Sequence, residues 1–239
     1  MLVTIHQPEH LPWLGFFDKA RRADVLVLLD SVQFRKNYFQ NRNRVRGQNG
    51  ALWVTVPVLT KGSADQAISD VRINSDGSPR WREKYWGTVE QNYRHAPFWS
   101  EYAEELRQSL WSETVSLSHL NMRLIEMLLR RLRIDVRIAR SSDLNVTGSR
   151  SELLLNICQR VEADRYLSGI SGRDYLDRSL FDSAGIGVDF HEFHHPVYSQ
   201  RHEPFVPCMS AVDLLFNHGP TSADILQGIG VEVMEEVFT

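Results

Sequence analysis

The chain has 239 residues, of which 42% are hydrophobic and 24% are charged, and its 27 Lys and Arg against 30 Asp and Glu give a formal net charge of −3. These values are typical of a globular protein and exclude a disordered chain, which has few apolar residues or a large charge imbalance. The slightly acidic balance also argues against a protein whose whole surface binds nucleic acid. The length fits one large domain, or one domain with a smaller appendage.

Cys158 and Cys208 are too few for a disulfide scaffold or a four-cysteine zinc site. The first residues carry neither the basic nor the apolar segment of a signal peptide. The longest apolar run, residues 25–29, is far shorter than a membrane span. We therefore expect a cytoplasmic protein without a membrane span.

The N-terminal part of the sequence predicts strands with one helix between them. Residues 2–5 predict a short apolar strand, and residues 13–23 predict a helix after a loop with two prolines. The continuous apolar run at 25–29 is typical of a strand buried on both faces, as in a parallel sheet. Residues 52–58 are rich in β-branched side chains and predict another strand, and 71–73 predict a short one.

The middle of the chain has the aromatic and leucine spacing of helices. Helices are predicted at residues 81–93, 98–111 and 115–132, the last with a leucine stripe opposite arginines. We predict that residues 81–132 are a helical insertion or cap within a single α/β domain that spans residues 1–239.

The C-terminal part alternates strands and helices again. Strands are predicted at residues 135–139, 165–168 and 188–193. Helices are predicted at 149–161, 175–184, 210–219 and 222–237. A capping box of Ser149 and Glu152 begins the first of these helices. The alternation at both ends of the chain predicts an α/β fold with a mostly parallel, Rossmann-like sheet flanked by helices.

Ligands of open parallel sheets bind beyond the carboxyl ends of the strands. That rule selects the loops at residues 6–13, 30–46, 141–149 and 168–175. The first loop is the most informative, because His6 and Gln7 stand between a strand and a helix N-terminus, where anions bind. The structural alternative is a rigid turn in which His6 hydrogen-bonds within the core.

The loop predicted at residues 30–46 interleaves cations, amides and aromatics. Between 35 and 46 it holds five cations and no acid, whereas residues 222–239 hold four acids and no cation. Cations bind phosphate and aromatics stack on bases, so the loop favours a phosphorylated or nucleotide-like ligand. It would also suit RNA, and the structural alternative is an exposed basic loop.

Two further loops carry weaker signals. Ser141 and Ser142 offer hydroxyls after a strand, and Gly169 and Gly172 permit close backbone approach to a ligand. The second loop lacks the lysine of a Walker A motif and is not GxGxxG.

Four histidines near the C-terminus invite comparison with a zinc site. They are His191, His194, His195 and His202. Positions i and i+3 of a strand face opposite sides, so polar packing or substrate contact is favoured over zinc and no metal site is predicted.

Several motifs resemble the WbqC-like protein family, and they extend over essentially the whole chain. They are His6-Gln7-Pro8 with Leu11-Pro12-Trp13, Gln40-Asn41-Arg42-Asn43-Arg44, Trp53-x-Thr55-Val56-Pro57, Tyr166-Leu167-Ser168-Gly169, His195-Pro196-x-Tyr198-x-Gln200 and Ser210-x-x-Asp213. Two departures are Tyr85, where the family pattern has histidine, and His10, where it has another residue.

The resemblance implies a role in the biosynthesis of O-antigen or other surface polysaccharides. It suggests a transferase that attaches an amino acid such as glycine, or another acyl group, to a nucleotide-linked amino sugar. Activation of the acyl group through an adenylate implies ATP and Mg²⁺ as cofactors, unless the donor arrives activated, for example as an aminoacyl-tRNA. The His6 loop is loosely similar to the histidine-bearing loop of pantothenate synthetase.

On this hypothesis the catalytic residues are His6, Asp30 and Arg42. His6 stabilises charge in the transition state, Asp30 is a base or a Mg²⁺ ligand, and Arg42 neutralises phosphate. The residues expected to bind nucleotide or substrate are Gln7, Lys19, Gln33, Asn41, Arg44, Ser141, Ser142, Ser168, Gly169, Tyr175, Tyr198 and Gln200.

Two alternatives from other classes remain open. One is a non-catalytic binding or assembly protein of polysaccharide biosynthesis, which tolerates changes at the proposed catalytic residues. The other is an RNA- or tRNA-binding module centred on residues 35–46, with steeply salt-dependent binding. A homodimer is compatible with any of the three.

Overall fold

The computed structural model describes residues 1–59 and 65–234, and the chain forms two compact units. The first unit consists of residues 1–7, 15–32 and 134–193, and the second of residues 8–14, 33–133 and those from 194 onward. The helices predicted within 81–132 belong to the second unit.

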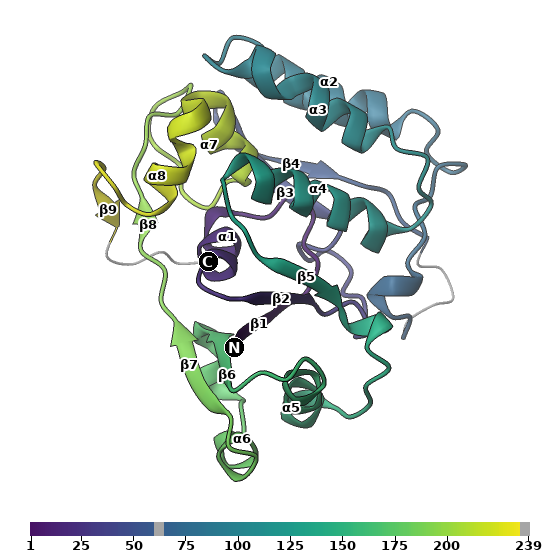
Figure 1. Ribbon diagram of the computed structural model, residues 1–239. Helices are drawn as coiled ribbons and strands as arrows, with labels where there is room; N and C mark the ends of the chain where they lie inside the picture. The colour runs from purple at the N-terminus through teal and green to yellow at the C-terminus, as the bar shows by residue number, and fades with distance from the viewer. Residues whose placement is uncertain (60–64, 235–239) are drawn as a thin grey trace. The chain divides into compact units, whose positions relative to one another are not determined.

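The first unit is built on a five-stranded sheet in which every pair of neighbours is parallel, in the order β5-β2-β1-β6-β7 (Figure 1). Its strands are β1 (Leu2–His6), β2 (Val25–Leu28), β5 (Arg137–Arg140), β6 (Arg165–Gly169) and β7 (Gly187–His191). Counted along this sheet in chain order, the strands follow the 3-2-1-4-5 order of the Rossmann fold. The predicted parallel, Rossmann-like sheet is confirmed.

Helices α1 (Leu14–Arg21), α5 (Arg150–Arg160) and α6 (Arg178–Ser183) accompany this sheet, with short 3₁₀ turns η2 (Ser141–Asp143) and η3 (Ile170–Asp174). Alternate residues of the strands share one face. On that face Val3 and Val25 pack with Ile157 of α5 and Phe181 of α6 in one buried apolar cluster. The burial of all four residues of β2 explains its continuous apolar sequence.

The second unit combines an antiparallel hairpin with helices. The hairpin pairs β3 (Arg42–Gly47) with β4 (Gly50–Thr55). The helices are α2 (Trp81–Tyr93), α3 (Trp99–Leu110), α4 (Leu117–Arg131), α7 (Ala211–His218) and α8 (Ser222–Leu226), with 3₁₀ turns η1 (Ile68–Asp70) and η4 (Gly219–Thr221) and a small pair β8 (His195–Pro196) and β9 (Val233–Met234). The leucines of α4 are buried, as the stripe predicted.

Four sequence predictions of local structure were wrong. Residues 42–46, the last five of the predicted 30–46 loop, belong to strand β3, because β4 pairs with them. Residues 71–73 make only isolated bridges. Helix α5 forms without a side-chain bond from Ser149, so the capping box is absent. The last helix ends at Leu226, before Gly228 and Gly230, both with positive φ, and residues 235–237 of that prediction lie outside the described residues.

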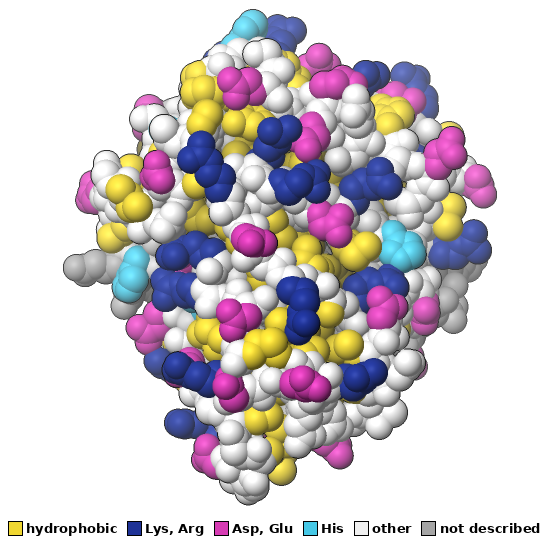
Figure 2. Space-filling view, viewed as in Figure 1, with side chains coloured by type: hydrophobic (Ala, Val, Ile, Leu, Met, Phe, Trp, Pro, Cys, Tyr) yellow, Lys and Arg dark blue, Asp and Glu magenta, His cyan; other side chains and the backbone are white. Residues whose placement is uncertain are grey.

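Charged groups of both signs alternate on the surface. Figure 2 shows Lys and Arg side chains interspersed with Asp and Glu on the face it presents, which agrees with the small net charge. Within residues 1–59 and 65–234, every helix is too short or too polar to cross a bilayer.

Candidate functional site

The switch point of the first unit lies between β1 and β6, because the chain leaves these neighbouring strands toward opposite edges of the sheet. His6 ends β1 and is level with Leu28 and Arg140 at the ends of β2 and β5. Gly169 ends β6 opposite His191 of β7. Seven of the predicted site residues stand at or just beyond this carboxyl edge. They are His6, Gln7, Asp30, Ser141, Ser142, Ser168 and Gly169.

The surroundings of His6 keep its imidazole neutral. Its Nδ1 donates to the Gln7 carbonyl at 3.0 Å, and its ring meets Phe16 edge-on, 4.9 Å between centroids. Burial, and then the charge of Lys19, lower the pKa of His6 to about 3. With Nδ1 donating, Nε2 has acceptor character, so the positive charge at this end of β1 belongs to Lys19.

Lys19 is buried and reaches back from α1 to the end of β1. Its Nζ donates to the Ile5 carbonyl at 3.2 Å. This places the ammonium of Lys19, one of the residues expected to bind nucleotide or substrate, beside the carboxyl edge of the sheet.

A buried hydrogen bond joins Asp18 and His191, and no sequence motif predicted it. His191 Nε2 lies 2.7 Å from Asp18 Oδ2, and Arg21 and Arg22 pair with the same carboxylate at 2.7 and 3.0 Å. Burial raises the pKa of Asp18, but the hydrogen bond from His191 and the two arginine charges outweigh it, and the net pKa is below its usual value. The pair joins α1 to the end of β7. No local motif signals a contact across 173 positions.

Asp30 holds the turn that follows β5. Its Oδ1 accepts from Ser141 Oγ at 3.3 Å and from the Ser142 amide at 3.0 Å, and its Oδ2 accepts from Ser142 Oγ at 3.1 Å. The carboxylate is fully buried. These contacts give Asp30 a positioning role for both serines. Across the part of the chain that the structure describes, no group of three or more His, Cys, Asp or Glu side chains could hold a metal ion.

The Ser168 hydroxyl occupies the space that a side chain at Gly172 would need. The Ser168 hydroxyl is fully buried and makes no well-formed hydrogen bond with the described residues. A Cβ at Gly172 would lie 2.1 Å from Ser168 Oγ, so the glycine makes room for the hydroxyl. Tyr175, another predicted binding residue, lies at the surface of the same unit, 60% exposed.

In the second unit, Arg42 and Arg44 occupy alternate positions of β3 and so share a face of the hairpin. Trp53 of β4 pairs with Arg44, and its ring centre lies 4.2 Å from the Arg42 guanidinium carbon and 6.0 Å from that of Arg44. The Phe39 ring centre lies 5.9 Å from the Arg44 guanidinium carbon. Neither arginine forms an ion pair with a carboxylate of the described residues. We call Phe39, Arg42, Arg44 and Trp53 the hairpin face.

The other residues of the second unit that were predicted to bind nucleotide or substrate form hydrogen bonds within that unit. Asn41 donates to the Val56 carbonyl at 2.9 Å, and Gln33 donates to Asp65 at 3.0 Å. Tyr198 and Gln200 each donate to a carboxylate oxygen of Asp213 at 2.9 Å, as does Tyr93 at 2.8 Å.

Asp213 is the centre of that network. Burial raises its pKa, although the donated hydrogen bonds and the charge of Arg46 oppose the rise. Tyr198 and Gln200 therefore hold α7 in place, a role that the sequence motif alone did not distinguish from ligand binding.

His195 and His191, from the predicted histidine cluster, also form hydrogen bonds. His195 Nε2 accepts from the Cys208 amide at 3.1 Å, and Nδ1 donates to the Pro196 carbonyl at 2.8 Å. His191 belongs to the first unit and pairs with Asp18, as described above. His191 and His195 therefore each hydrogen-bond within their own unit.

The fold and the switch-point residues define an α/β protein with a Rossmann-like sheet. The model of the WbqC-like protein family matches residues 7–225, and the chain belongs to this family. It is similar to the uncharacterized protein Rv1507c of Mycobacterium tuberculosis, with 36% identity over 227 residues that cover 94% of this chain and 97% of the relative. No solved structure matches the chain.

Proposed function

We propose that the protein is a transferase of surface-polysaccharide biosynthesis that joins an amino acid such as glycine, or another acyl group, to a nucleotide-linked amino sugar. The observation that carries the proposal is the hairpin face, where two guanidinium groups without carboxylate partners flank an exposed indole. Arginine binds phosphate oxygens in a bidentate way, and an indole stacks on a base.

The details of the hairpin face suit a diphosphate. The Nε atoms of Arg42 and Arg44 are buried and make no hydrogen bond within the described residues. Trp53 is 45% exposed, so its ring is accessible to a planar group. Thr55, which pairs with Arg42, also lines a cavity of about 540 Å³ together with Arg80 and Lys84, which adds two cations.

The first unit supplies chemistry that suits an acyl acceptor. The neutral His6 ring has acceptor character toward an amine or hydroxyl, Lys19 supplies positive charge, and Asp30 positions Ser141 and Ser142. For the donor we propose an acyl adenylate, formed from the acyl carboxylate and ATP with Mg²⁺ as pyrophosphate leaves. Attack by the sugar amine on the acyl carbon then forms the amide and releases AMP and a proton. Aminoacyl-tRNA is the alternative donor, and it would need no ATP.

Isothermal titration with UDP-glucosamine tests the binding step. Because each arginine contributes charge-assisted bonds, Arg42→Gln and Arg44→Gln should each weaken binding at least ~10-fold, which corresponds to the loss of about 1.4 kcal/mol. The control is Arg123→Gln, an exposed arginine of α4, which should bind as the wild type does. Absence of binding, or equal binding by all four proteins, would contradict the proposal.

Transfer of labelled glycine to UDP-glucosamine tests the reaction. The wild-type protein should form the product with ATP and Mg²⁺, and His6→Ala should bind the nucleotide sugar but lose turnover. Unchanged turnover in His6→Ala removes that residue from the reaction, and turnover with glycyl-tRNA but not with ATP identifies the other donor.

One observation favours RNA binding as a second candidate. Tyr38 is 40% exposed next to Phe39, and the Arg35 guanidinium carbon lies 4.9 Å from the Tyr38 ring centre, which extends the hairpin face. Such aromatic and cationic groups bind single strands. Tighter binding of a single-stranded RNA than of UDP-glucosamine, with a steep salt dependence, would support this candidate over the transferase.

A further inference from the structure

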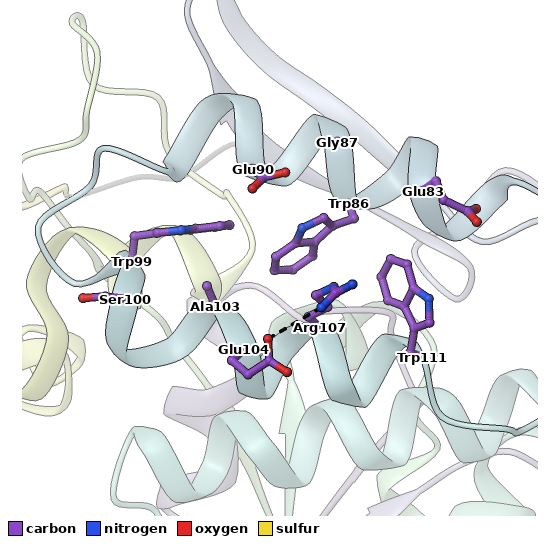
Figure 3. Close-up of a pocket in the computed structure, with 10 residues that line it drawn as sticks. All are labelled: Glu83, Trp86, Gly87, Glu90, Trp99, Ser100, Ala103, Glu104, Arg107 and Trp111. Atoms are coloured by element: carbon purple, nitrogen blue, oxygen red, sulfur yellow. Dashed lines mark ion pairs between the residues drawn. The ribbon is translucent and has the colours of Figure 1, made fainter.

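Helices α2 and α3 of the second unit border a groove that no step above uses. Its volume is about 610 Å³, within the range of roughly 300–1,000 Å³ typical of small-molecule sites. Figure 3 shows three indoles along it, with Trp86 from α2, Trp99 at the start of α3 and Trp111 just beyond its end. We call this the tryptophan groove.

The three tryptophans form a partly exposed aromatic wall. Trp86 lies 5.4 Å from Trp99 with the planes tilted by 35°, and 6.3 Å from Trp111 with the planes nearly perpendicular at 86°. Trp99 is anchored on Phe216, 5.0 Å away. All three indoles are half-buried, so each keeps area open to the groove. Contiguous exposed aromatic surface is costly in water and marks a binding surface.

Gly87 is an independent sign that this space is kept open. It lies inside α2, where glycine is less favourable than alanine, and its backbone does not require glycine. A Cβ at this position would meet nothing within 4 Å. Since Gly87 lines the groove, the effect of having no side chain there is to leave the groove wider.

The polar lining is acidic and only partly neutralised. Arg107 lies 3.8 Å from Glu104 and 5.2 Å from the Trp111 ring centre. Glu83 and Glu90, on the α2 side in Figure 3, form no ion pair with the described residues. The groove therefore has three carboxylates against one guanidinium.

We infer that the tryptophan groove binds a saccharide of one or two sugar rings. The C–H faces of a sugar ring stack on indole faces, and its hydroxyls donate to carboxylates and accept from a guanidinium. The interleaving of charged groups with the indoles disfavours the apolar face of a partner helix, which requires a hydrophobic groove. The unpaired Glu83 and Glu90 favour sugars that carry free amines over neutral ones.

Titration calorimetry at pH 6.5 with three disaccharides tests the inference: cellobiose, diacetylchitobiose and the fully deacetylated glucosamine disaccharide. All three should bind, with dissociation constants near ~1 mM or below, and the amine-bearing sugar should bind at least ~5-fold more tightly than cellobiose. Lysine amide is the fourth probe. Equal binding of lysine amide and the glucosamine disaccharide would overturn the inference, because the sugar ring would then contribute nothing.

Gly87→Leu is the decisive variant, because it fills the groove while improving helix propensity. Saccharide binding should fall at least ~10-fold while the thermal midpoint stays equal or rises. Glu90→Gln should remove the preference for the amine, whereas Glu101→Gln, an exposed carboxylate of α3 outside the groove, should change nothing. Wild-type affinity in Gly87→Leu, or no binding of any disaccharide by the wild type, would overturn the inference.

The inference does not depend on the transferase proposal. The disaccharides carry no phosphate, and Arg42 and Arg44 do not line the groove. Loss of saccharide binding with normal UDP-glucosamine binding refutes the groove alone, and the reverse result refutes the hairpin face alone.

Discussion

Gly172 gives the sharpest prediction for a single residue. In Gly172→Ala the new Cβ would stand 2.1 Å from Ser168 Oγ and 3.4 Å from Phe190, a clash that must turn the Ser168 hydroxyl or shift η3 or β6. Overpacking of this kind costs about 1–3 kcal/mol. We expect that loss in the free energy of unfolding, measured by urea denaturation. Removing the hydroxyl as well, in Ser168→Ala/Gly172→Ala, should restore part of it.

Gly169 is the matched control for this prediction. It lies three positions earlier, has an ordinary extended backbone with φ −66°, and a Cβ there would meet nothing within 4 Å. Gly169→Ala should change the stability by less than about 0.5 kcal/mol. Equal costs at the two glycines would show that the space around Ser168 is not the cause.

The two departures from the family pattern, His10 and Tyr85, contact each other. The Tyr85 hydroxyl donates to His10 Nε2 at 2.8 Å, and His10 Nδ1 donates to the Asn121 side-chain carbonyl at 3.0 Å. Asn121 in turn uses its amide nitrogen on the Pro8 and Gln40 carbonyls. This network fixes the tautomer of His10 and gives it a buried structural role.

At the scale of the secondary-structure element, the N-terminal caps of α4 and α5 differ. Ser116 accepts from the His119 amide at the start of α4, whereas Ser149 makes no side-chain bond at the start of α5 despite its capping-box sequence. Loss of a real cap costs about 1 kcal/mol. Ser116→Ala should therefore lower the free energy of unfolding by about that amount, and Ser149→Ala by less than about 0.5 kcal/mol. A larger cost at Ser149 in the same urea titration would reverse this assignment.

Strands and helices whose own residues show a clear hydrophobic pattern were predictable from the sequence. The apolar run at 25–29 gave β2, and the leucine stripe gave α4 within a few residues. Strand β3 was missed, because the residues that alternate with its arginines include only one apolar side chain, Val45, and pairing with β4 is what makes the segment a strand. The end of the last helix depended on Gly228 and Gly230, which the periodicity of the segment did not take into account.

The candidate site also combines features that the local sequence predicted with features that depend on contacts between distant segments. The loops at the carboxyl edge were predictable, because the carboxyl ends of parallel strands share one edge of the sheet, but the strand order that places the switch point between β1 and β6 came only from the structure. The Asp18–His191 pair and the Asp213 network were not predictable, because each depends on contacts between distant segments. The sequence indicated the chemistry of Arg42 and Arg44, but the hairpin register was needed to show that they share a face with Trp53.

At the scale of the whole molecule, buried neutral histidines make stability depend on pH. Burial lowers the pKa of His10 to about 4, partly opposed by Asn121, and burial lowers the pKa of His195 as well. Burial and Lys19 lower that of His6 to about 3. An unfolded histidine titrates near 6.5, so below that pH the unfolded chain binds more protons than the folded one. The stabilising contribution is complete above pH 6.5 and is lost as the pH falls toward 4.

Urea denaturation at several values between pH 7 and pH 4.5 measures this effect. His10 is fully buried, and its shift corresponds to roughly 3 kcal/mol when the transition is complete, so the free energy of unfolding should decrease steadily through this window. His10→Gln should flatten the profile, because it removes one group whose pKa differs between the folded and unfolded chains. Asp18 acts with the same sign only at lower pH, since its lowered pKa lies below the window, whereas Asp213, whose pKa is raised by burial, acts with the opposite sign. A flat profile from pH 7 to pH 5 would show that burial does not lower the pKa of these histidines, because the folded and unfolded chains would then bind the same number of protons.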